Sequence, residues 1–260
     1  MITSTANSQV KQVNALAKKA KLRKETGLFL AEGPKMFEEA PKEWIEKVYV
    51  SESFLKNHES VVSGYRYETV SGEVMKYMAD TQTPQGILAL VRQPSWKMED
   101  LIRRKQTGPA LVIVLETLQD PGNLGTIIRA GEGAGVTGVV MNRETADIFS
   151  PKVIRSTMGA VYRVPFIYTD DLKETVNSMK REGIRFYAAH LRGKSDYDEG
   201  NYAADSAFMI GNEAKGLSEE AADLADCCIK IPMLGKVESL NAAVAASVLM
   251  FEAARQRRRR

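Results

Sequence analysis

The sequence predicts an α/β protein of two domains, the second built around a parallel sheet. From residue 110 onward, unbroken apolar segments of strand length alternate with helical segments, a pattern typical of a parallel sheet covered on both faces. A break precedes this region, where Gln93-Pro94-Ser95 is followed by a charged stretch and then by Gly108-Pro109. The 260 residues, 44% of them hydrophobic, suffice for two cores. We therefore predict domains at 1–92 and 110–260, joined by a linker at 93–109.

The N-terminal domain is predicted to be a smaller α/β unit. Residues 6–24 place Val10, Val13 and Leu16 on one face of a helix and most of the basic residues on the opposite face. Pro34 stands at a position suited to the first residue of a helix, directly after Gly33. The predicted strands are 28–31, 48–50, 65–70 and 87–91, and the shorter helices are 34–40 and 74–79.

The C-terminal domain is predicted to alternate strands and helices. Its strands are 110–115, 136–141, 164–167, 184–189, 207–210 and 228–231. Its helices are one capped by Asn123, one from Ser150-Pro151 to Ala160, one capped by Asp170 or Asp171 and ending at Arg181, and one over 218–225. Ser239 is expected to cap the last helix, 240–255, whose small residues allow close packing.

Polar and glycine-rich residues follow several of these strands. They comprise residues 116–123, His190, residues 211–216 and residues 232–240. Because ligands of parallel sheets bind beyond the carboxyl ends of the strands, we expect one crevice to hold all of them. In the last of these segments, free N–H groups at a helix start beside Gly235 favour a small polar or anionic ligand. The alternative is an ordinary connection between a strand and a helix.

Two common nucleotide-binding motifs are excluded. Residues 133–138 match G-x-G-x-x-G, but this segment closes a helix and leads into a strand, which reverses the order that the dinucleotide fingerprint requires. We interpret Gly133 and Gly135 as turn and helix-end residues and predict no nicotinamide cofactor. Residues 211–216 lack the spacer and the Lys-Ser/Thr pair of a P-loop.

Composition also argues against a membrane or metal-binding role. No apolar run approaches the roughly 20 residues of a membrane span, and the polar N-terminus has no signal-peptide core. The only cysteines, Cys227 and Cys228, are neighbours on a predicted strand, where side chains point to opposite faces. With only His58 and His190 elsewhere, they build no metal site. We expect packing roles for both in a reducing, cytoplasmic compartment.

The basic residues are unevenly distributed, although the net charge is only +3. Residues 1–24 contain no acidic residue, and the chain ends in four arginines at 257–260. The basic residues of the first segment are Lys11, Lys18, Lys19, Lys21, Arg23 and Lys24. Such clusters are typical of surfaces that bind RNA phosphates. A solvated helix face and a frayed tail are the alternative interpretation.

Three stretches of the C-terminal domain form an ordered set of motifs. They are Asp120 to Ala130, Ile210 to Leu217 and Ile231 to Asn241. Together and in this order they resemble the three motifs of the SpoU (TrmH-like) RNA ribose methyltransferases of the SPOUT superfamily, over residues 110–256. The N-terminal unit, with Phe29 to Gly33, looks like the substrate-binding domain, similar to ribosomal protein L30e, that many members carry.

The resemblance implies an activity, a cofactor and an assembly. It implies 2′-O-methylation of an RNA nucleotide with S-adenosylmethionine, a homodimer, and a C-terminal trefoil knot that general topology rules would disfavour. The separate N-terminal domain favours ribosomal RNA of the large subunit as the substrate. The alternatives are a transfer-RNA methyltransferase, a non-catalytic RNA-binding ribosome factor, and an enzyme that methylates a base nitrogen.

The resemblance also implies roles for individual residues. The catalytic candidates are Asn123, Arg129, Glu213, Ser239 and Asn241, and the cofactor-binding candidates are His190, Met209, Gly211, Gly216, Ile231, Met233 and Leu240. We expect Arg129 to contact the RNA and stabilise the attacking oxygen or a phosphate, because a guanidinium is a poor proton acceptor. Glu213 either holds the substrate hydroxyl or fixes its loop through backbone N–H groups.

Overall fold

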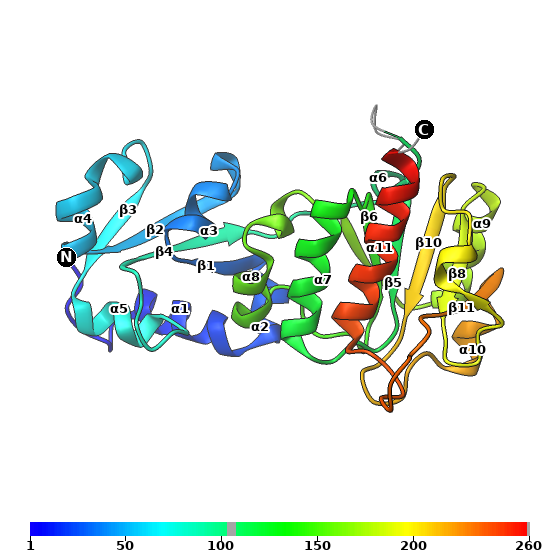
Figure 1. The fold of residues 1–260 in the computed structure, drawn as a ribbon. Helices are drawn as coiled ribbons and strands as arrows, with labels where there is room; N and C mark the ends of the chain where they lie inside the picture. Colours follow the sequence, from blue (N-terminus) through cyan, green and yellow to red (C-terminus); the bar gives the residue numbers. More distant parts are fainter. Residues whose placement is uncertain (103–107, 259–260) are drawn as a thin grey trace. The chain divides into compact units, whose positions relative to one another are not determined.

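The structure, a computed structural model, describes residues 1–102 and 108–258 and divides into two compact units. The first unit comprises Met1–Ser95 and Asp147–Tyr162, and the second comprises Trp96–Ala146 and Arg163–Arg260 (Figure 1). A segment between two strands of the second unit therefore belongs to the first. The linker predicted at 93–109 contains a short helix, α6 (Met98–Ile102). Residues 103–107 of that linker and the last two arginines lie outside the described residues.

The first unit is built on a four-stranded sheet in the order β1-β4-β2-β3. Strands β1 and β2 run antiparallel to β4, whereas β2 and β3 are parallel. Apolar residues of α1 and α5 form its core with side chains of the sheet, among them Val13, Leu16 and Met78. The elements are α1 (Ser8–Lys18), α2 (Ala20–Thr26), β1 (Leu28–Glu32), α3 (Pro34–Glu39), η1 (Lys42–Trp44), β2 (Ile45–Ser51), α4 (Glu52–His58), η2 (Glu59–Val62), β3 (Tyr67–Val70), α5 (Gly72–Met78), β4 (Ile87–Arg92), α8 (Pro151–Thr157) and η3 (Ala160–Tyr162).

The single basic helix predicted over residues 6–24 is instead two helices, α1 and α2. The break is at Lys19, whose backbone is extended, with φ −117 and ψ 107. In an unbroken helix the carbonyls of Leu16 and Ala17 would accept hydrogen bonds from backbone N–H groups four residues later. Here the guanidinium of Arg23 donates to both carbonyls, at 2.6 and 3.1 Å, so α1 ends without leaving them unsatisfied.

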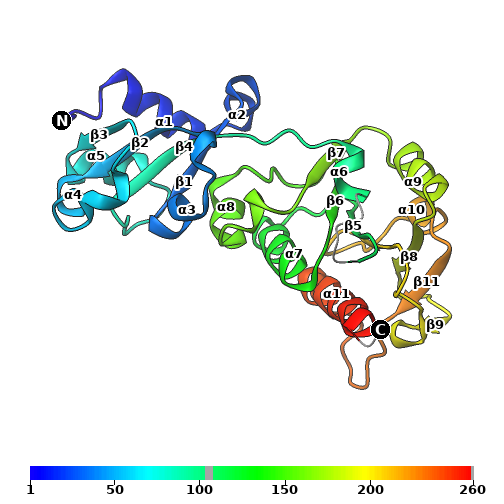
Figure 2. The same cartoon turned by 90° about the horizontal axis from the view of Figure 1, so that it is seen from above.

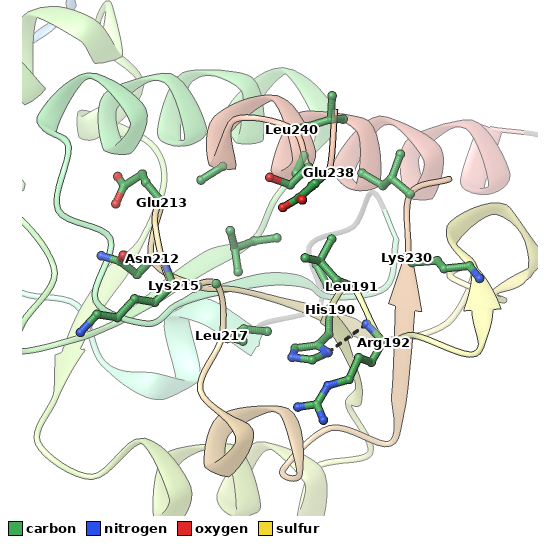
Figure 3. Close-up of a pocket in the computed structure, with 18 of the residues that line it drawn as sticks. His190, Leu191, Arg192, Asn212, Glu213, Lys215, Leu217, Lys230, Glu238 and Leu240 are labelled. Atoms are coloured by element: carbon green, nitrogen blue, oxygen red, sulfur yellow. Dashed lines mark hydrogen bonds between the residues drawn. The ribbon is translucent and has the colours of Figure 1, made fainter. Parts of the chain in front are cut away.

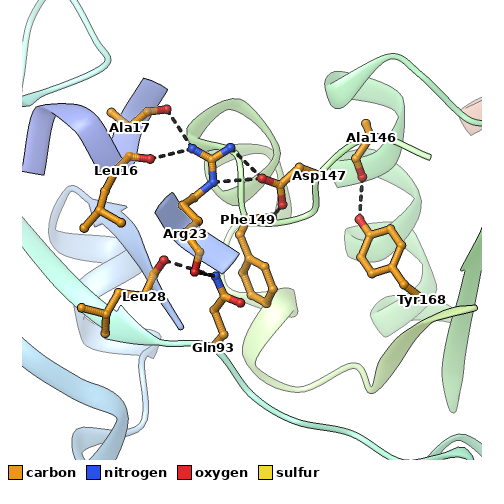
Figure 4. A network of polar contacts seen from close by, with 9 residues as sticks. All are labelled: Leu16, Ala17, Arg23, Leu28, Gln93, Ala146, Asp147, Phe149 and Tyr168. Carbon is orange, nitrogen blue, oxygen red and sulfur yellow. Dashed lines mark hydrogen bonds and ion pairs between the residues drawn. The ribbon is translucent and has the colours of Figure 1, made fainter. Parts of the chain in front are cut away.

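Arg23 is a structural residue, which corrects its assignment to the RNA-binding surface. Its side chain is only 6% exposed, and its Nε and a terminal nitrogen donate to Asp147 Oδ2 at 2.9 and 2.6 Å (Figure 4). The guanidinium thus joins the end of α1 to the segment that carries α8. The other basic residues of this segment are lysines with exposed side chains, namely Lys11, Lys18, Lys19, Lys21 and Lys24.

The second unit is built on a seven-stranded sheet in the order β7-β6-β5-β10-β8-β11-β9, in which every pair is parallel. This confirms the parallel sheet predicted from the apolar runs. Helices α6, α9 and α10 cover one face and α7 and α11 the other (Figure 2). The trefoil knot stays a prediction. The elements besides α6 are β5 (Leu111–Leu115), α7 (Pro121–Ala134), β6 (Gly138–Asn142), β7 (Phe166–Thr169), α9 (Leu172–Arg181), β8 (Arg185–Ala189), β9 (Ser195–Asp196), η4 (Tyr197–Glu199), β10 (Ser206–Ile210), α10 (Glu219–Ala222), β11 (Cys227–Lys230) and α11 (Ala242–Arg258).

The described residues contain neither a membrane-spanning helix nor a cluster of metal ligands. Within residues 1–102 and 108–258, no helix has the length and apolar character needed to cross a bilayer. Across the same residues, no three His, Cys, Asp or Glu side chains are grouped so as to hold a metal ion.

We expect Arg23→Met to lower the free energy of unfolding of the first unit by about 3 kcal/mol. The change leaves two carbonyls without donors and removes the cation from Asp147, whose carboxylate keeps, among the described residues, only the Phe149 N–H. Urea unfolding followed by Trp44 fluorescence in a Trp96→Phe background reports this unit, because the chain has only these two tryptophans. Arg155→Met is the control, since its ion pair with Asp80 is more exposed, at 33% and 41%, and should cost less than about 1 kcal/mol. Equal losses in both variants would contradict the structural role of Arg23.

Candidate functional site

The order of the strands brings the three motif segments to one edge of the second unit's sheet. The first segment follows β5, the second follows β10 and the third follows β11. In the sheet these strands and β8 are consecutive, in the order β5-β10-β8-β11. Because all of them are parallel, their carboxyl ends meet at the same edge, together with His190 after β8. The predicted crevice is found for His190 and for the segments after β10 and β11, whereas residues 116–123 do not line it. The order of the strands could not be read from the sequence.

A cavity of about 420 Å³ lies at this edge, a size typical of small-molecule sites. Asn212, Glu213 and Lys215 gather on one side of it, and His190 and Arg192 on another (Figure 3). Of the residues expected to bind a cofactor, the cavity is lined by His190, Gly211, Gly216, Ile231, Met233 and Leu240. Met209 is the exception.

Met209 is fully buried in the core under α9 and α10. Side chains of a strand alternate between the two faces of the sheet, and on β10 Ala207 and Met209 share the face that packs in this core. Met209 does not line the cavity, which corrects its assignment to the adenine pocket. Ile210 and Gly211, which follow it, do line the cavity.

Gly211 is needed because two backbone segments meet there. A Cβ on Gly211 would lie 2.1 Å from the carbonyl carbon of Gly216 and from the nitrogen of Leu217, so no other residue fits without moving the backbone. Asn212 and Gly216 exchange backbone hydrogen bonds of 3.0 and 2.8 Å, and Gly216 has φ +70. The second motif is thus a closed turn whose backbone forms part of the cavity wall.

The side chain of His190 bonds its own loop through Nδ1. Its Nδ1 accepts the backbone N–H of Arg192 at 3.2 Å, so in the neutral ring Nε2 is the donor. Nε2 lies 4.0 Å from Glu219 Oε1, and Glu219 also forms an ion pair with Arg192. This side of the cavity therefore offers an imidazole N–H beside a paired carboxylate and guanidinium.

A chain of hydrogen bonds joins one residue from each motif. Asn241 Oδ1 accepts the backbone N–H groups of Ala243 and Val244 at 2.9 and 3.3 Å, so its Nδ2 faces outward. That Nδ2 donates to Asn123 Oδ1 at 3.0 Å, and Asn123 Nδ2 donates in turn to Glu213 Oε1 at 3.1 Å. The network fixes the orientation of both amides. It ties the third motif to the first and the first to the second.

Glu213 is held by the loop that precedes α7. Its carboxylate accepts the backbone N–H of Asp120 at 2.8 Å and that of Gln119 at 3.2 Å, besides the Asn123 amide. Burial alone would raise the pKa of Glu213, but hydrogen bonds from the backbone and from Asn123 outweigh it and hold the pKa below its usual value. Glu213 is therefore ionised at neutral pH and fixes the first motif.

The two helix caps differ from those predicted. Asp120, not Asn123, caps α7, because its side chain accepts the backbone N–H of Asn123 at 2.8 Å. Helix α11 begins at Ala242, and Asn241 caps it in place of Ser239. Asn123 in the first turn of α7 and Asn241 at the cap of α11 therefore place the hydrogen bond between them at the starts of two helices. Asp171 caps α9, one of the two predicted candidates.

The remaining catalytic candidates are Ser239 and Arg129. Ser239 lies in the loop before α11 and lines the cavity. Arg129 lies two turns into α7 with an exposed side chain, and among the described residues it has no hydrogen bond or ion pair. It is therefore available for a ligand, whereas Arg257 of the terminal run is not. The Arg257 guanidinium donates to the carbonyls of Pro109, Ala110, Tyr202 and Ala204.

Sequence reasoning assigned no role to three residues in or next to the motif loops, namely Thr117, Asn142 and Asn212. Their side chains and backbones connect the ends of β5, β6 and β10 by hydrogen bonds. The one available signal was that asparagine after a strand commonly bonds backbone groups of a turn. It does not indicate which turn.

Comparison with known proteins gives consistent matches over both parts of the chain. The SpoU rRNA Methylase family profile matches residues 110–251, and the profile of an MRM3-like substrate binding domain matches residues 7–89. The 23S rRNA (guanosine(2553)-2'-O)-methyltransferase RlmP of Bacillus subtilis is 33% identical over 96% of this chain and 97% of its own.

Solved structures match equally widely. An AdoMet-bound rRNA methyltransferase from Sinorhizobium meliloti is 30% identical, with a TM-score of 0.85 over 98% of this chain and 97% of its own. The SpoU methyltransferase AviRb from Streptomyces viridochromogenes, in complex with AdoMet, is 25% identical, with a TM-score of 0.87 over 96% of this chain and 98% of its own.

Proposed function

Because the chain belongs to the SpoU rRNA methylase family, we propose that it transfers the methyl group of S-adenosylmethionine to the 2′-oxygen of a nucleotide in RNA, with ribosomal RNA of the large subunit as the substrate. The observation that carries the proposal is the hydrogen-bonded chain Glu213–Asn123–Asn241, which joins all three motifs beside the cavity. The B. subtilis relative, which is named as a 23S rRNA 2′-O-methyltransferase, supports the choice of substrate.

The cavity fits the proposed cofactor in size and chemistry. Its walls combine backbone of the second and third motifs with the apolar side chains of Ile231, Met233 and Leu240, which suits an adenosine. His190 and Arg192 offer polar partners on a different side from Glu213 (Figure 3), and Glu219 forms an ion pair with Arg192. When bound, S-adenosylmethionine supplies a methyl group on a sulfonium, which is open to in-line displacement by an oxygen nucleophile.

The protein's contribution to such a displacement is alignment and charge. Glu213 accepts three hydrogen bonds and has a lowered pKa, so it is a poor base for a ribose hydroxyl and instead holds Asn123 in place. Ser239 adds a hydroxyl to the cavity wall. We assign Arg129 to the RNA, where its free guanidinium stabilises the attacking oxygen or the neighbouring phosphate.

The N-terminal domain and a second copy of the chain complete the proposal. Residues 1–92 are assigned to RNA binding, 93–109 to the linker and 110–260 to catalysis, and the match of residues 7–89 to a substrate-binding domain supports this division. A homodimer is supported by α11, which exposes Val244 and Phe251 seven residues apart on one face, at 49% and 48%. Sedimentation of the full chain measures the dimer directly.

Two measurements test the function. The full chain should bind S-adenosylmethionine in calorimetry, and 2′-O-methyl mapping of ribosomal RNA should show one modified position that depends on the protein. A folded chain that leaves millimolar S-adenosylmethionine unbound would overturn the enzyme and favour an RNA-binding ribosome factor. A protein-dependent methyl group in transfer RNA alone would overturn the choice of substrate.

Arg129→Ala should reduce methyl transfer by at least about 100-fold, the scale of losing one transition-state charge donor, and leave cofactor affinity nearly unchanged. Single-turnover rates and calorimetry separate the two effects. Arg181→Ala is the matched control, because that arginine also lies on an exposed helix of the second unit but is paired with Glu174. A loss of cofactor binding in Arg129→Ala would assign Arg129 to the structure of the site.

Changing Lys11, Lys18, Lys19 and Lys24 to Gln should flatten the salt dependence of RNA binding. Each phosphate that no longer meets a lysine lowers the magnitude of the slope of log K against log salt by roughly 0.7 to 0.9. The KM for RNA should rise, while calorimetry with S-adenosylmethionine should show no change. Lys173→Gln on α9 serves as the control. An unchanged slope in the fourfold variant would mean that these lysines only solvate their helices.

A further inference from the structure

Thr117 adopts a backbone conformation that β-branched residues rarely adopt. It follows β5 with φ +55, in the left-handed region, where the side chain of a non-glycine residue is strained. Such outliers persist only when their surroundings hold them, and they cluster at functional sites. In the described part of the chain only Met158 is comparable, and it ends α8, where a left-handed residue is common.

Two asparagines from the neighbouring strands hold Thr117 in this conformation. Asn142, at the end of β6, accepts the Thr117 N–H at 2.7 Å and donates to Thr117 Oγ1 at 2.9 Å. Asn212, after β10, donates to the Thr117 carbonyl at 2.9 Å. The backbone N–H, the carbonyl and the hydroxyl of Thr117 are therefore all hydrogen-bonded by residues at the ends of β6 and β10, the two strands that flank β5.

The asparagines are themselves fixed, so the arrangement is rigid. Asn142 Oδ1 also accepts the hydroxyl of Thr145 at 2.8 Å. Asn212 Oδ1 accepts the backbone N–H groups of Ala214 and Lys215 at 3.0 and 3.1 Å, so its Nδ2 must face Thr117. Two contacts therefore join the turn that carries Glu213 to the loop that carries Asp120. One is the hydrogen bond from Asn212 to Thr117, and the other is the Glu213 carboxylate itself.

We propose that Thr117, Asn142 and Asn212 form a clasp that positions Glu213 and Asn123 for methyl transfer. The left-handed turn at Thr117 sets the direction of the following residues. As a result the consecutive N–H groups of Gln119 and Asp120 both point at the Glu213 carboxylate. None of the three clasp residues is assigned to bind RNA or the reacting methyl group. They are positioning residues, and their functional role rests on the proposed activity.

The clasp predicts a graded response at position 142. Asn142→Leu keeps the number and branching of the side-chain heavy atoms and removes the hydrogen bonds to Thr117 and Thr145. The N–H groups of Gln119 and Asp120 should therefore lose their fixed direction. Because a misplacement of about 1 Å can cost on the order of 100-fold in rate, we expect kcat to fall by at least about 10-fold. The KM for S-adenosylmethionine should rise by a smaller factor.

Asn142→Asp is the rescuing variant. One carboxylate oxygen still accepts the Thr117 N–H and the Thr145 hydroxyl, and the Thr117 hydroxyl can turn to donate to the other. We therefore expect kcat within about 3-fold of the wild type, since the same groups remain hydrogen-bonded. If Asn142→Asp is as slow as Asn142→Leu, the hydrogen bonds to Thr117 are not what positions the loop, and the proposal is overturned.

Thr137→Val is the matched control for stability. Thr137 is buried at the opposite edge of the same sheet, where its hydroxyl bonds the backbone of Leu111 at 3.1 Å as both donor and acceptor. This variant also removes buried hydrogen bonds, so its melting temperature should fall as in Asn142→Leu, whereas its kcat should remain near the wild-type value. A kcat loss in Thr137→Val as large as in Asn142→Leu would overturn the clasp.

Hydrogen exchange separates the clasp from the proposed function. In Asn142→Leu the amides of Gln119 and Asp120 should exchange at least about 10-fold faster than in the wild type, whereas in Thr137→Val they should not. If these amides accelerate but the wild type transfers no methyl group, the proposed function fails and the clasp stands. Unchanged exchange at both amides in a folded Asn142→Leu protein would overturn the clasp whatever the activity.

Discussion

The site depends on the carboxylate of Glu213, which accepts two consecutive backbone N–H groups and one side-chain amide from the first motif. These donors stand at the start of α7, where a helix leaves backbone N–H groups without partners inside the helix. One of the first free N–H groups, that of Asn123, bonds Asp120, and the two N–H groups just before the helix bond Glu213. Glu213, from the loop after β10, thus bonds the backbone that leads into α7, while Asp120 bonds the helix itself. The loops of β5 and β10 therefore cannot move independently without leaving an ionised carboxylate short of donors.

A similar double use of one side chain occurs at α11. Asn241 caps this helix with its oxygen and uses its remaining amide hydrogen to hold Asn123. Because an asparagine side chain has one acceptor group and one donor group, using the acceptor at the helix fixes the direction of the donor. Neither a serine nor an aspartate at this position would supply both contacts, since serine is too short and aspartate has no donor when ionised. One asparagine side chain therefore both caps α11 and links the third motif to the first.

Sequence patterns predicted the parts of this site that local chemistry determines. The apolar runs indicated the strands of the parallel sheet, and the three motifs held Asn123, Glu213 and Asn241, which the structure joins. The cap of α11 was predicted at Ser239 and is instead Asn241, because both residue types suit an N-cap and the loop geometry decides where the helix begins. Met209 was misplaced because strand periodicity shows that neighbours face opposite sides but not which side holds the cavity. Thr117 was missed because its conformation is imposed by asparagines on two other strands, against its own preference.

The basic residues illustrate how tertiary contacts sort side chains that look alike in a sequence. Arg23 and Arg257 both lie in cationic clusters of the sequence. In the structure, both guanidinium groups donate hydrogen bonds to backbone carbonyls at the ends of helices and strands. A guanidinium presents five donors in a rigid plane, which suits it to several carbonyls at once, whereas a lysine ammonium is a compact point charge on a flexible stem. The N-terminal surface is consequently left with lysines. Lysines that meet phosphates supply affinity without reading sequence, so the choice of nucleotide must be made by groups that contact bases or by the shape of the RNA.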